Sequence, residues 1–283
     1  MLTLYDFDNS VCCQKVRITL REKGLDWQAI RINLFANKQY APDYLKLNPK
    51  GVVPTLVHNG LPIVESTLIC EYIDETFPNP PLMPKDPAGR ARARSWSKTV
   101  DEGLFVGVGA LSFSAMFRER MRTMPPEMRE KRLQNIGDPQ RRDRFTSLYE
   151  HGVQSPIVLH AVAAYESAFK TLEKTIAEGG PWILGARPTL ADISLMPMVA
   201  RLDYMQLLDV WTADRPHVRA WWAQAQAWPS FRSGLADLIP APEIAEMKQH
   251  GLPIRDQVAS RRAEVLRELD LAAKAQASRG EGE

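Results

Sequence analysis

The sequence predicts an N-terminal α/β unit followed by an all-α remainder. Strand and helix patterns alternate over residues 1–78, and a stiff proline-rich stretch occupies residues 79–87. Beyond that stretch no strand pattern competes with helical periodicity. A length of 283 residues suits one large domain or two smaller ones, so we expect a two-domain architecture of these two classes.

The N-terminal region contains, in order, a strand, a helix, a second strand, a hairpin and a second helix. The strands show short apolar or alternating patterns, and the helices place apolar residues at helical spacing. Asn59-Gly60 marks the hairpin, because both positions of its two-residue turn need a positive φ. Along the chain the predicted elements cover residues 2–5, 11–23, 27–34, 54–58 with 61–64, and 66–77.

The C-terminal region is predicted to be helical, with one polar interruption at residues 118–150. Arginines there alternate with acidic residues and with Pro and Gly breakers, which favours a solvated insertion between two long helices. The alternative is that some arginines bind the carboxylate of an acidic substrate. The predicted helices cover residues 88–117, 156–178, 190–208 and 216–226. The predicted domains are 1–78, a linker at 79–87, a helical substrate domain at 88–245, and a C-terminal extension at 246–283 with a disordered end.

Composition excludes several classes of protein. The chain is 45% apolar and 25% charged with a net charge of +2, which gives no general attraction to nucleic acid or to an anionic membrane. No apolar run reaches the roughly 18 residues of a membrane span, and the N-terminus lacks a secretory signal pattern. Three cysteines and five scattered histidines predict a reducing cytoplasm and no metal site.

Ser10, at the junction of the first strand and the first helix, is the strongest catalytic candidate. It occupies an N-cap position, where the first-turn amides lack partners and favour negative charge. A hydroxyl can cap a helix and still donate a hydrogen bond to a thiolate. Cys12 lies in the first turn, where a lowered thiol pKa is expected. Cys13 shares a helical stripe with Val16 and Leu20, which predicts that it packs in the core.

Two further positions suit the binding of a peptide with an amino-acid head. Pro54 stands at the entry to a strand, and a cis Val53–Pro54 bond would turn the Val53 backbone outward to pair with an extended ligand, although trans is the commoner isomer. Ser66 is the expected N-cap of the next helix, whose free amides can hold a carboxylate. Glu65 can pair with an ammonium group.

Four motifs carry a family resemblance: N-S-V-C-C-Q-K-V-R, L-N-P-K-G-V-V-P-T-L, V-E-S-T-L-I-C-E-Y-I and G-A-R-P-T-L-A-D. On these motifs residues 1–85 resemble the thioredoxin-like N-terminal domain of cytosolic glutathione transferases, and the helical remainder is similar to their C-terminal domain. The last motif is an N-capping box at Thr189 and Asp192, with a role in folding. The resemblance implies glutathione as co-substrate, a small hydrophobic electrophile as second substrate, and a homodimer.

The resemblance also implies roles for individual residues. Ser10 falls on the catalytic serine of the theta and zeta classes. Asp101 resembles an acid that in some classes reaches the glutathione of a neighbouring subunit. The other implied contacts to glutathione are Lys38 and Gln39 for the glycyl carboxylate, Val53 and Pro54 for the cysteinyl backbone, and Glu65 and Ser66 for the γ-glutamyl group.

The subfamily is less sharply indicated. Ser10-x-Cys12 is similar to the serine–cysteine pair of zeta-class maleylacetoacetate isomerases and of tetrachlorohydroquinone reductive dehalogenases, in which the cysteine takes up glutathione as a mixed disulfide. The length of residues 118–150 departs from the zeta class, and V-D-E at 100–102 is similar to the lignin β-etherases.

We therefore expect a glutathione transferase that attacks an aromatic electrophile by conjugation or by thiolytic ether cleavage. Gly103, Gly107, Phe113 and Phe117 are the expected substrate pocket, with close helix packing as the alternative for the glycines. Two other functions stay open: a reductive dehalogenase, isomerase or thiol–disulfide enzyme that uses Cys12, and a non-catalytic binding module of the same fold.

Overall fold

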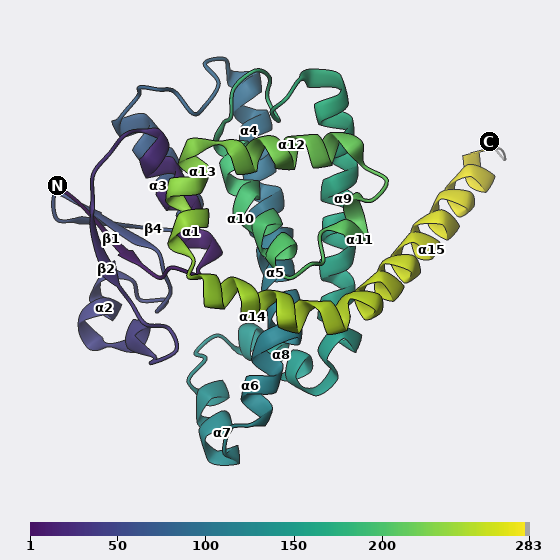
Figure 1. Ribbon diagram of the computed structural model, residues 1–283, viewed down its shortest axis with the longest axis horizontal. Coiled ribbons are helices and arrows are strands. Elements are labelled where there is room, and N and C mark those ends of the chain that lie inside the picture. The colour runs from purple at the N-terminus through teal and green to yellow at the C-terminus, as the bar shows by residue number, and fades with distance from the viewer. Residues whose placement is uncertain (281–283) are drawn as a thin grey trace. The chain divides into compact units, whose positions relative to one another are not determined.

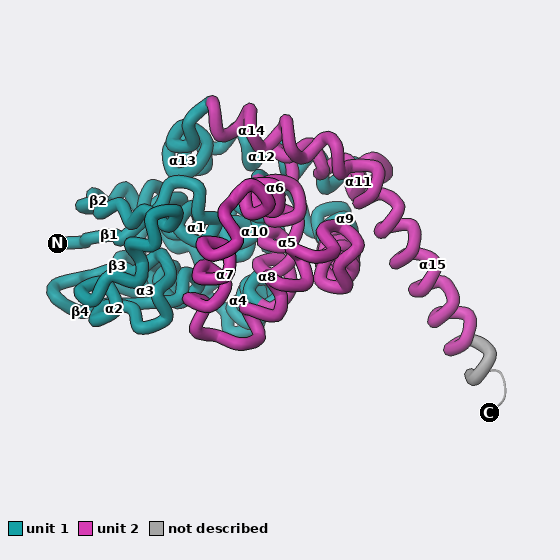
Figure 2. The backbone as a smooth tube through the Cα atoms, turned by 90° about the horizontal axis from the view of Figure 1, so that it is seen from below, with its two compact units in different colours: residues 1–101, 172–200, 216–241 teal, residues 102–171, 201–215, 242–283 magenta. Residues whose placement is uncertain are grey.

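The computed structural model describes the backbone of residues 1–280 and the side chains up to residue 276; residues 281–283 lie outside the described part. The chain forms two compact units, each built from separate segments (Figure 2). Unit 1 comprises residues 1–101, 172–200 and 216–241, and unit 2 comprises residues 102–171, 201–215 and the chain from 242 onward. Helical segments from the second half of the chain therefore complete unit 1, a grouping that differs from the division at residues 79–87.

The sheet of unit 1 has four strands in the order β2-β1-β3-β4 (Figure 1). β1 pairs in parallel with β2 and antiparallel with β3, which pairs antiparallel with β4. Asn59 and Gly60 join the last two strands with φ of 51° and 85°, so the predicted hairpin turn is confirmed. The strands are β1 (Leu2–Asp6), β2 (Gln28–Arg31), β3 (Thr55–His58) and β4 (Leu61–Val64).

The helices of the N-terminal region are α1 (Val11–Glu22), α2 (Pro42–Leu47) and α3 (Ser66–Thr76), with a 3-10 turn η1 (Lys38–Tyr40). α1 forms the crossover that a parallel β1–β2 pair requires. α2 and η1 were not predicted, because segments of six and three residues are too short to show a periodic pattern. The apolar stripes of α1 and α3 are buried as predicted, with Val16, Leu20, Ile69 and Ile73 wholly inaccessible.

A long helical stretch follows the linker and carries two π-helical turns, η2 (Val100–Leu104) and η3 (Phe113–Phe117). Six of the later helices begin at a proline. Proline suits the first helical position because an N–H there would have no acceptor within the helix, so its absence costs no hydrogen bond. The helices are α4 (Pro87–Thr99), α5 (Phe105–Ser112), α6 (Arg118–Arg122), α7 (Pro126–Gln134), α8 (Pro139–His151), α9 (Pro156–Gly179), α10 (Leu190–Tyr204), α11 (Asp209–Thr212), α12 (Pro216–Ala227), α13 (Pro229–Gly234), α14 (Ala241–Gly251) and α15 (Arg255–Gly280), with 3-10 turns η4 (Gly152–Gln154), η5 (Ala236–Leu238) and η6 (Leu252–Ile254).

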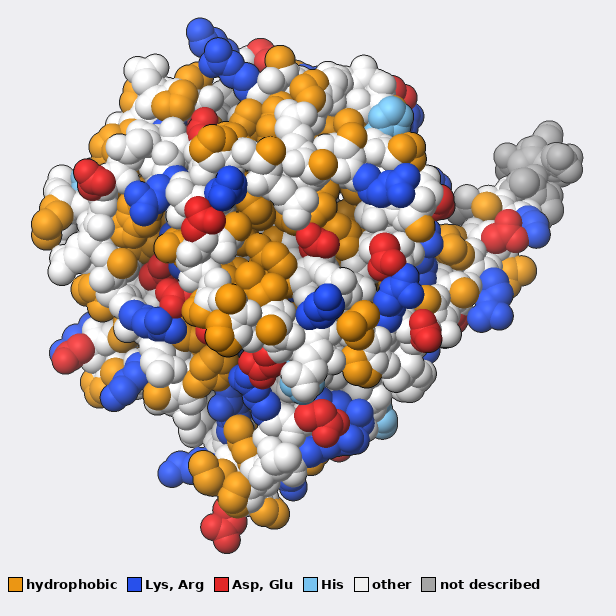
Figure 3. Space-filling model, in the orientation of Figure 1, with side chains coloured by type: hydrophobic (Ala, Val, Ile, Leu, Met, Phe, Trp, Pro, Cys, Tyr) orange, Lys and Arg blue, Asp and Glu red, His pale blue; other side chains and the backbone are white. Residues whose placement is uncertain are grey.

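Three expectations about this region need correction or comment. Residues 118–150 are mostly helical, as α6, α7 and α8, and α7 buries none of its residues, as a solvated surface requires. On the face in Figure 3, basic and acidic side chains are interspersed.

The predicted helix 190–208 ends at Tyr204, shortly before Gln206 takes a φ of 59°. The tail expected to be disordered is helical from residue 272 to Gly280 as part of α15; its last three residues lie outside the described range.

Asp192 forms the carboxylate half of the predicted capping box and accepts two further hydrogen bonds. Its Oδ2 accepts hydrogen bonds from the backbone N–H and the hydroxyl of Thr189, at 2.9 and 3.0 Å. Its Oδ1 accepts from the Ile183 N–H and the Trp221 indole N–H, both at 3.0 Å. The carboxylate is fully buried, and burial raises its pKa while the four donors oppose that rise.

Residues 87–122 are long and apolar enough to cross a bilayer by length and composition alone. The most apolar window of this stretch is 61% buried inside the protein. A core helix of a soluble protein passes the same test, so the stretch is weak evidence for a membrane span.

Candidate functional site

Ser10 caps α1, as the sequence predicts. Its hydroxyl oxygen accepts from the Cys13 N–H at 3.4 Å, and the first turn contains no acidic residue that would offset the positive helix end. The Ser10 N–H donates to Phe7 O at 3.0 Å, which fixes the entry into the helix. The side chain is half-buried, so it is held in place and still reachable from outside.

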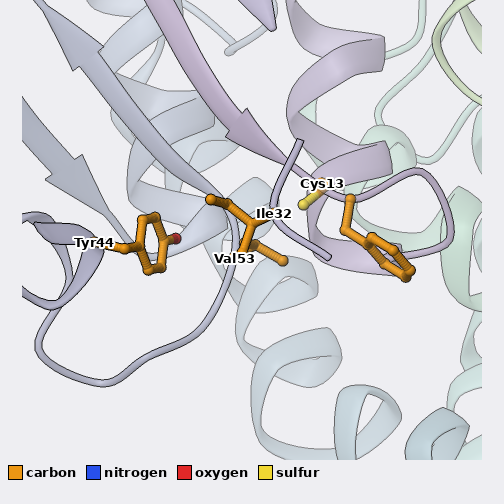
Figure 4. Close-up of a cluster of buried hydrophobic side chains, with 5 residues drawn as sticks. Cys13, Ile32, Tyr44 and Val53 are labelled. Carbon is orange, nitrogen blue, oxygen red and sulfur yellow. The ribbon is translucent and has the colours of Figure 1, made fainter. Parts of the chain in front are cut away.

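Cys13 lies behind Ser10 in the core, as its periodicity predicts. It is fully buried with Phe7, Ile32, Tyr44 and Val53, and its sulfur faces Ile32 (Figure 4). Burial, reinforced by the Asp6 carboxylate, raises the pKa of the Cys13 thiol well above its usual range. The Arg17 guanidinium and a side-chain hydrogen bond with Ser10 lower that pKa but do not offset the burial.

Cys12 differs from the expectation of a lowered pKa. Burial raises the pKa of its thiol, while the Lys15 ammonium and a hydrogen bond with Ser66 act in the opposite direction. Desolvation therefore outweighs the nearby cation, and the pKa of the Cys12 thiol lies above its usual value.

α1 and α3 contact each other through three polar pairs that run in the same direction along both helices. Cys12 hydrogen-bonds Ser66, Lys15 Nζ donates to Thr67 Oγ1 at 2.7 Å, and Thr19 Oγ1 donates to Cys70 Sγ at 3.2 Å. Cys70 is buried in the core as predicted, and burial raises its pKa to about 11. The N-termini of both helices are thereby brought together.

Glu65, rather than Ser66, occupies the N-cap position of α3. The helix begins at Ser66, which is buried, and the Glu65 side chain makes no capping hydrogen bond. Glu65 has φ 69° and ψ 110°, a sparsely populated conformation that the surrounding structure must enforce and that is typical of ligand-binding positions. Its carboxylate pairs with Lys50 Nζ at 2.6 Å in an exposed ion pair.

The loop before β3 is held in place by hydrogen bonds from Tyr44 and Asn48. The Val53–Pro54 bond is cis, and Val53 is buried in the cluster with Cys13. Tyr44 Oη and Asn48 Nδ2 both donate to Val52 O, at 2.6 and 2.9 Å. The position of the Val53 backbone is therefore fixed by the hydrogen bonds to Val52 and by the buried Val53 side chain.

Lys38 and Gln39 belong to η1, which packs against Gly51 of the loop before β3. A Cβ at Gly51 would lie 3.2 Å from Gln39 O and 2.9 Å from the Tyr40 ring, which together with its φ of 60° explains the glycine. Lys38 is exposed and Gln39 is buried, with no hydrogen-bond partner for Gln39 Oε1 within the described residues. A buried amide oxygen without a partner costs about 1–3 kcal/mol, so Gln39 is suited to receive a donor from a ligand.

Asp101, in η2, reaches the N-terminus of α3 within unit 1. Its Oδ1 accepts from Lys15 Nζ at 3.2 Å, and its Oδ2 accepts from Thr67 Oγ1 at 2.6 Å. Lys15 and Thr67 were not predicted from the sequence. The available signal was that Lys15 occupies a core-facing position of α1, between Cys12 and Thr19.

The predicted pocket residues belong to unit 2, where their contacts favour packing for three of the four. A Cβ at Gly107 would lie 3.3 Å from Ala161 and Tyr165 of α9, and one at Gly103 would lie 3.4 Å from Ala164. Phe113 is 3% exposed and packs on Phe145 with ring centroids 5.2 Å apart. These contacts favour close packing, the alternative given for the glycines, and the pocket formed by Gly103, Gly107, Phe113 and Phe117 stays a prediction. Phe117 is half-buried, with the Arg120 guanidinium 5.6 Å from its ring.

No three His, Cys, Asp or Glu side chains come together at metal-ligand spacing in the part of the chain that the structure describes. All three cysteines are free thiols.

Comparisons with known proteins match both halves of the chain. The family model described as glutathione S-transferase, N-terminal domain, matches residues 4–81, and the model described as glutathione S-transferase, C-terminal domain, matches residues 120–223. Glutathione S-transferase 1 of Dianthus caryophyllus is 44% identical over 90 residues, which cover 32% of this chain and 41% of that protein.

Two other matches extend over most of the chain. Maleylacetoacetate isomerase of Pseudomonas aeruginosa is 30% identical over 236 residues, which cover 82% of this chain and 94% of that protein. The crystal structure of the beta-etherase LigF from a Sphingobium strain superposes with a TM-score of 0.73 at 26% identity, and covers 82% of this chain and 98% of that chain. These names support a glutathione-dependent enzyme.

Proposed function

The chain belongs to the glutathione S-transferase family, and from this premise we propose that it binds glutathione at the N-termini of α1 and α3 and ionises the glutathione thiol for attack on an apolar, aromatic electrophile. The observation that carries the proposal is the geometry of Ser10. Its half-buried hydroxyl caps α1 through an oxygen lone pair, so that its proton can be donated to a ligand thiolate next to first-turn amides that favour negative charge.

The remaining site residues would hold the tripeptide along unit 1. Lys38 would pair with the glycyl carboxylate, the unpartnered oxygen of Gln39 would accept a hydrogen bond from the glycyl N–H, and the Val53 backbone before Pro54 would pair with the cysteinyl unit. The first-turn amides of α3, at Ser66, would hold the γ-glutamyl carboxylate beside Glu65. In this arrangement the cysteinyl sulfur would lie at the N-terminus of α1, beside Ser10.

The proposed reaction needs only the activated thiolate. Glutathione releases its thiol proton to solvent, and the Ser10 hydroxyl donates a hydrogen bond to the sulfur that carries the negative charge. The sulfur then forms a bond to the electrophilic carbon, and the leaving group, a halide or an aryl oxide, departs with the electrons of its own bond. Likeness to the LigF structure supports thiolytic ether cleavage beside conjugation, and the match to an isomerase supports a glutathione-assisted isomerisation as the second candidate.

Ultraviolet titration of bound glutathione tests the proposal in the wild type, Ser10→Ala and Cys12→Ala. A hydrogen bond to a charged group contributes about 1.5–3 kcal/mol, so Ser10→Ala should raise the pKa of bound glutathione by roughly 1–2 units. Cys12→Ala should leave that pKa unchanged, because the Cys12 thiol is neutral and is not the activating group.

Turnover of an aryl halide and of a β-aryl ether is measured on the same three proteins. Both rates should fall in Ser10→Ala alone. If Cys12→Ala abolishes turnover while Ser10→Ala retains it, the enzyme instead works through a Cys12–glutathione mixed disulfide. Retention on a glutathione resin with no turnover of any electrophile would indicate a binding module.

A further inference from the structure

The turn that precedes Ser10 is held by two side chains of α1. The turn lies between β1 and α1, and it closes where the Ser10 N–H donates to Phe7 O at 3.0 Å. Asp8 O, inside the turn, accepts from Gln14 Nε2 at 3.2 Å and from Arg17 Nη2 at 2.7 Å. Both of these side chains are 2% exposed. The conformation of the turn therefore depends on residues that follow Ser10 in the helix.

Arg17 uses every edge of its guanidinium inside unit 1. Besides the bond to Asp8 O, Nη1 donates to both carboxylate oxygens of Asp6 at 2.8 Å, and Nε donates to Gly234 O at 2.9 Å. A lysine could neutralise Asp6, but an ammonium is a compact charge on a flexible stem, whereas a guanidinium presents its donors in fixed directions. The two backbone carbonyls therefore explain the arginine, and one of them belongs to the turn before Ser10.

A second ion pair holds the turn less firmly. The Asp8 carboxylate pairs with Arg31 Nη1 of β2 at 2.6 Å, but the Arg31 side chain is 59% exposed. Ion pairs in contact with water contribute little, while a buried hydrogen bond from a charged donor contributes more. The bonds that Arg17 and Gln14 make to Asp8 O are therefore the main restraint on the turn.

The cap of α1 alone fixes the Ser10 hydroxyl only loosely. The Cys13 N–H lies 3.4 Å from the hydroxyl oxygen, which is longer than an ordinary N–H···O hydrogen bond. The place of the hydroxyl is therefore also set by the turn that leads into it. A hydrogen bond weakens steeply when its donor tilts away from the acceptor, so a displaced turn would misdirect the hydroxyl.

We propose that Arg17 and Gln14 are positioning residues for Ser10: by holding Asp8 O they fix the turn from which the Ser10 hydroxyl reaches the glutathione sulfur. This inference rests on the proposed role of Ser10 in ionising the glutathione thiol. Both side chains are buried, so they act through the turn and do not touch the ligand.

The test removes both donors to Asp8 O in the full-length protein. Arg17→Lys keeps a positive charge for Asp6 and loses the guanidinium, and Gln14→Leu loses the amide at similar volume. Ultraviolet titration of the double variant should show the pKa of bound glutathione raised by up to roughly 1 unit, because the hydrogen bond to the thiolate is misaligned. Calorimetry with S-methylglutathione, which has no thiol to ionise, should give the Kd of the wild type.

A third substitution separates positioning from a general structural role. Ser10→Ala alone removes the hydroxyl, and adding Arg17→Lys and Gln14→Leu to it should raise the pKa of bound glutathione no further, because all three changes act through one hydrogen bond. Arg21→Lys is the matched control. Arg21 is an exposed arginine of the same helix whose guanidinium lies over the Trp27 ring, so the pKa should stay at the wild-type value.

A further rise in the Ser10→Ala background would overturn the inference, and so would equal weakening of S-methylglutathione, which would indicate general damage to the site. If the Arg17→Lys variant does not fold, Asp6→Asn with Arg17→Met removes the buried charge pair together and should raise the pKa in the same way. An unchanged pKa in Ser10→Ala itself would mean that the proposed function has failed. A raised pKa in Ser10→Ala with no rise in the folded Arg17 and Gln14 variants would contradict this inference alone.

Discussion

At the scale of the single residue, Gly107 shows why a helix accepts a residue that disfavours helix formation. α5 passes α9 so closely that the position of a Cβ at Gly107 is already 3.3 Å from side chains of Ala161 and Tyr165. Gly109, two residues further along the same helix, has no atom within 4 Å of its Cβ position. A side chain would meet tight contacts at Gly107 and open space at Gly109.

Gly107→Leu should lower the free energy of unfolding by about 1–3 kcal/mol, because the added side chain overpacks the contact between α5 and α9. Urea denaturation followed by circular dichroism measures the change. Gly109→Ala is the control, and it should stabilise the protein by up to about 1 kcal/mol through helix propensity. Equal stability of Gly107→Leu and the wild type would show that open space lies beside this glycine.

At the scale of the element, one carboxylate fastens α15 to the rest of unit 2. Glu166, on α9, is 4% exposed and pairs through Oε1 with Arg215 and through Oε2 with Arg262 of α15, the latter at 2.7 Å. Arg262 also donates to Val210 O at 2.8 Å. Beyond this anchor α15 exposes Leu266, Leu269 and Leu271, so its contacts concentrate on its first half.

Glu166→Gln should destabilise the protein by about 3–5 kcal/mol near neutral pH, because it leaves two arginines without their buried counter-charge. Burial raises the pKa of Glu166, but the two arginines outweigh it and hold the pKa below the usual value. A lowered pKa in the folded state gives stability that is present above the unfolded value of about 4.3 and is lost as the pH falls.

Urea midpoints measured from pH 7 to pH 3 test the Glu166 prediction. The wild type should lose stability more steeply than Glu166→Gln below about pH 5, so that the two curves converge. Glu178→Gln is the control on the same helix. Glu178 is exposed, and its ion pair with Lys174 is long at 3.9 Å, so this substitution should shift the urea midpoint little. Parallel curves for the wild type and Glu166→Gln would contradict the role of Glu166.

At the scale of the whole molecule, segments far apart in the sequence complete each unit. Arg17, on α1, donates from Nη1 to both oxygens of Asp6 at 2.8 Å and from Nε to Gly234 O of α13 at 2.9 Å. A Cβ at Gly234 would lie 2.8 Å from Ile18 N, so the backbones of α13 and α1 approach each other too closely for a side chain at this position. α1 therefore connects the sheet to α13 within unit 1.

We also propose that two copies associate, as the family resemblance implies. Light scattering during size-exclusion chromatography should give twice the chain mass of 32.0 kDa. The chain mass itself, unchanged from micromolar to near-millimolar protein, would rule out a stable dimer and leave each site to a single chain.

The sequence alone determined those features that depend on local pattern. The stripes of α1 and α3, the Asn59-Gly60 turn and the Thr189–Asp192 capping box follow from spacings of a few residues, because backbone geometry repeats over that range. Cys13 was correctly placed in the core for the same reason, and Ser10 was correctly placed as the cap of α1.

Only the tertiary structure decided the electrostatics of the site. The pKa of Cys12 rises rather than falls because α3 covers the first turn of α1 and removes water from the thiol, a contact between residues 54 positions apart. Lys15 gains its partners, and Gly107 its reason to be a glycine, from elements whose approach no local spacing encodes. Charge and desolvation depend on which surfaces meet, and that is settled only when distant segments pack together.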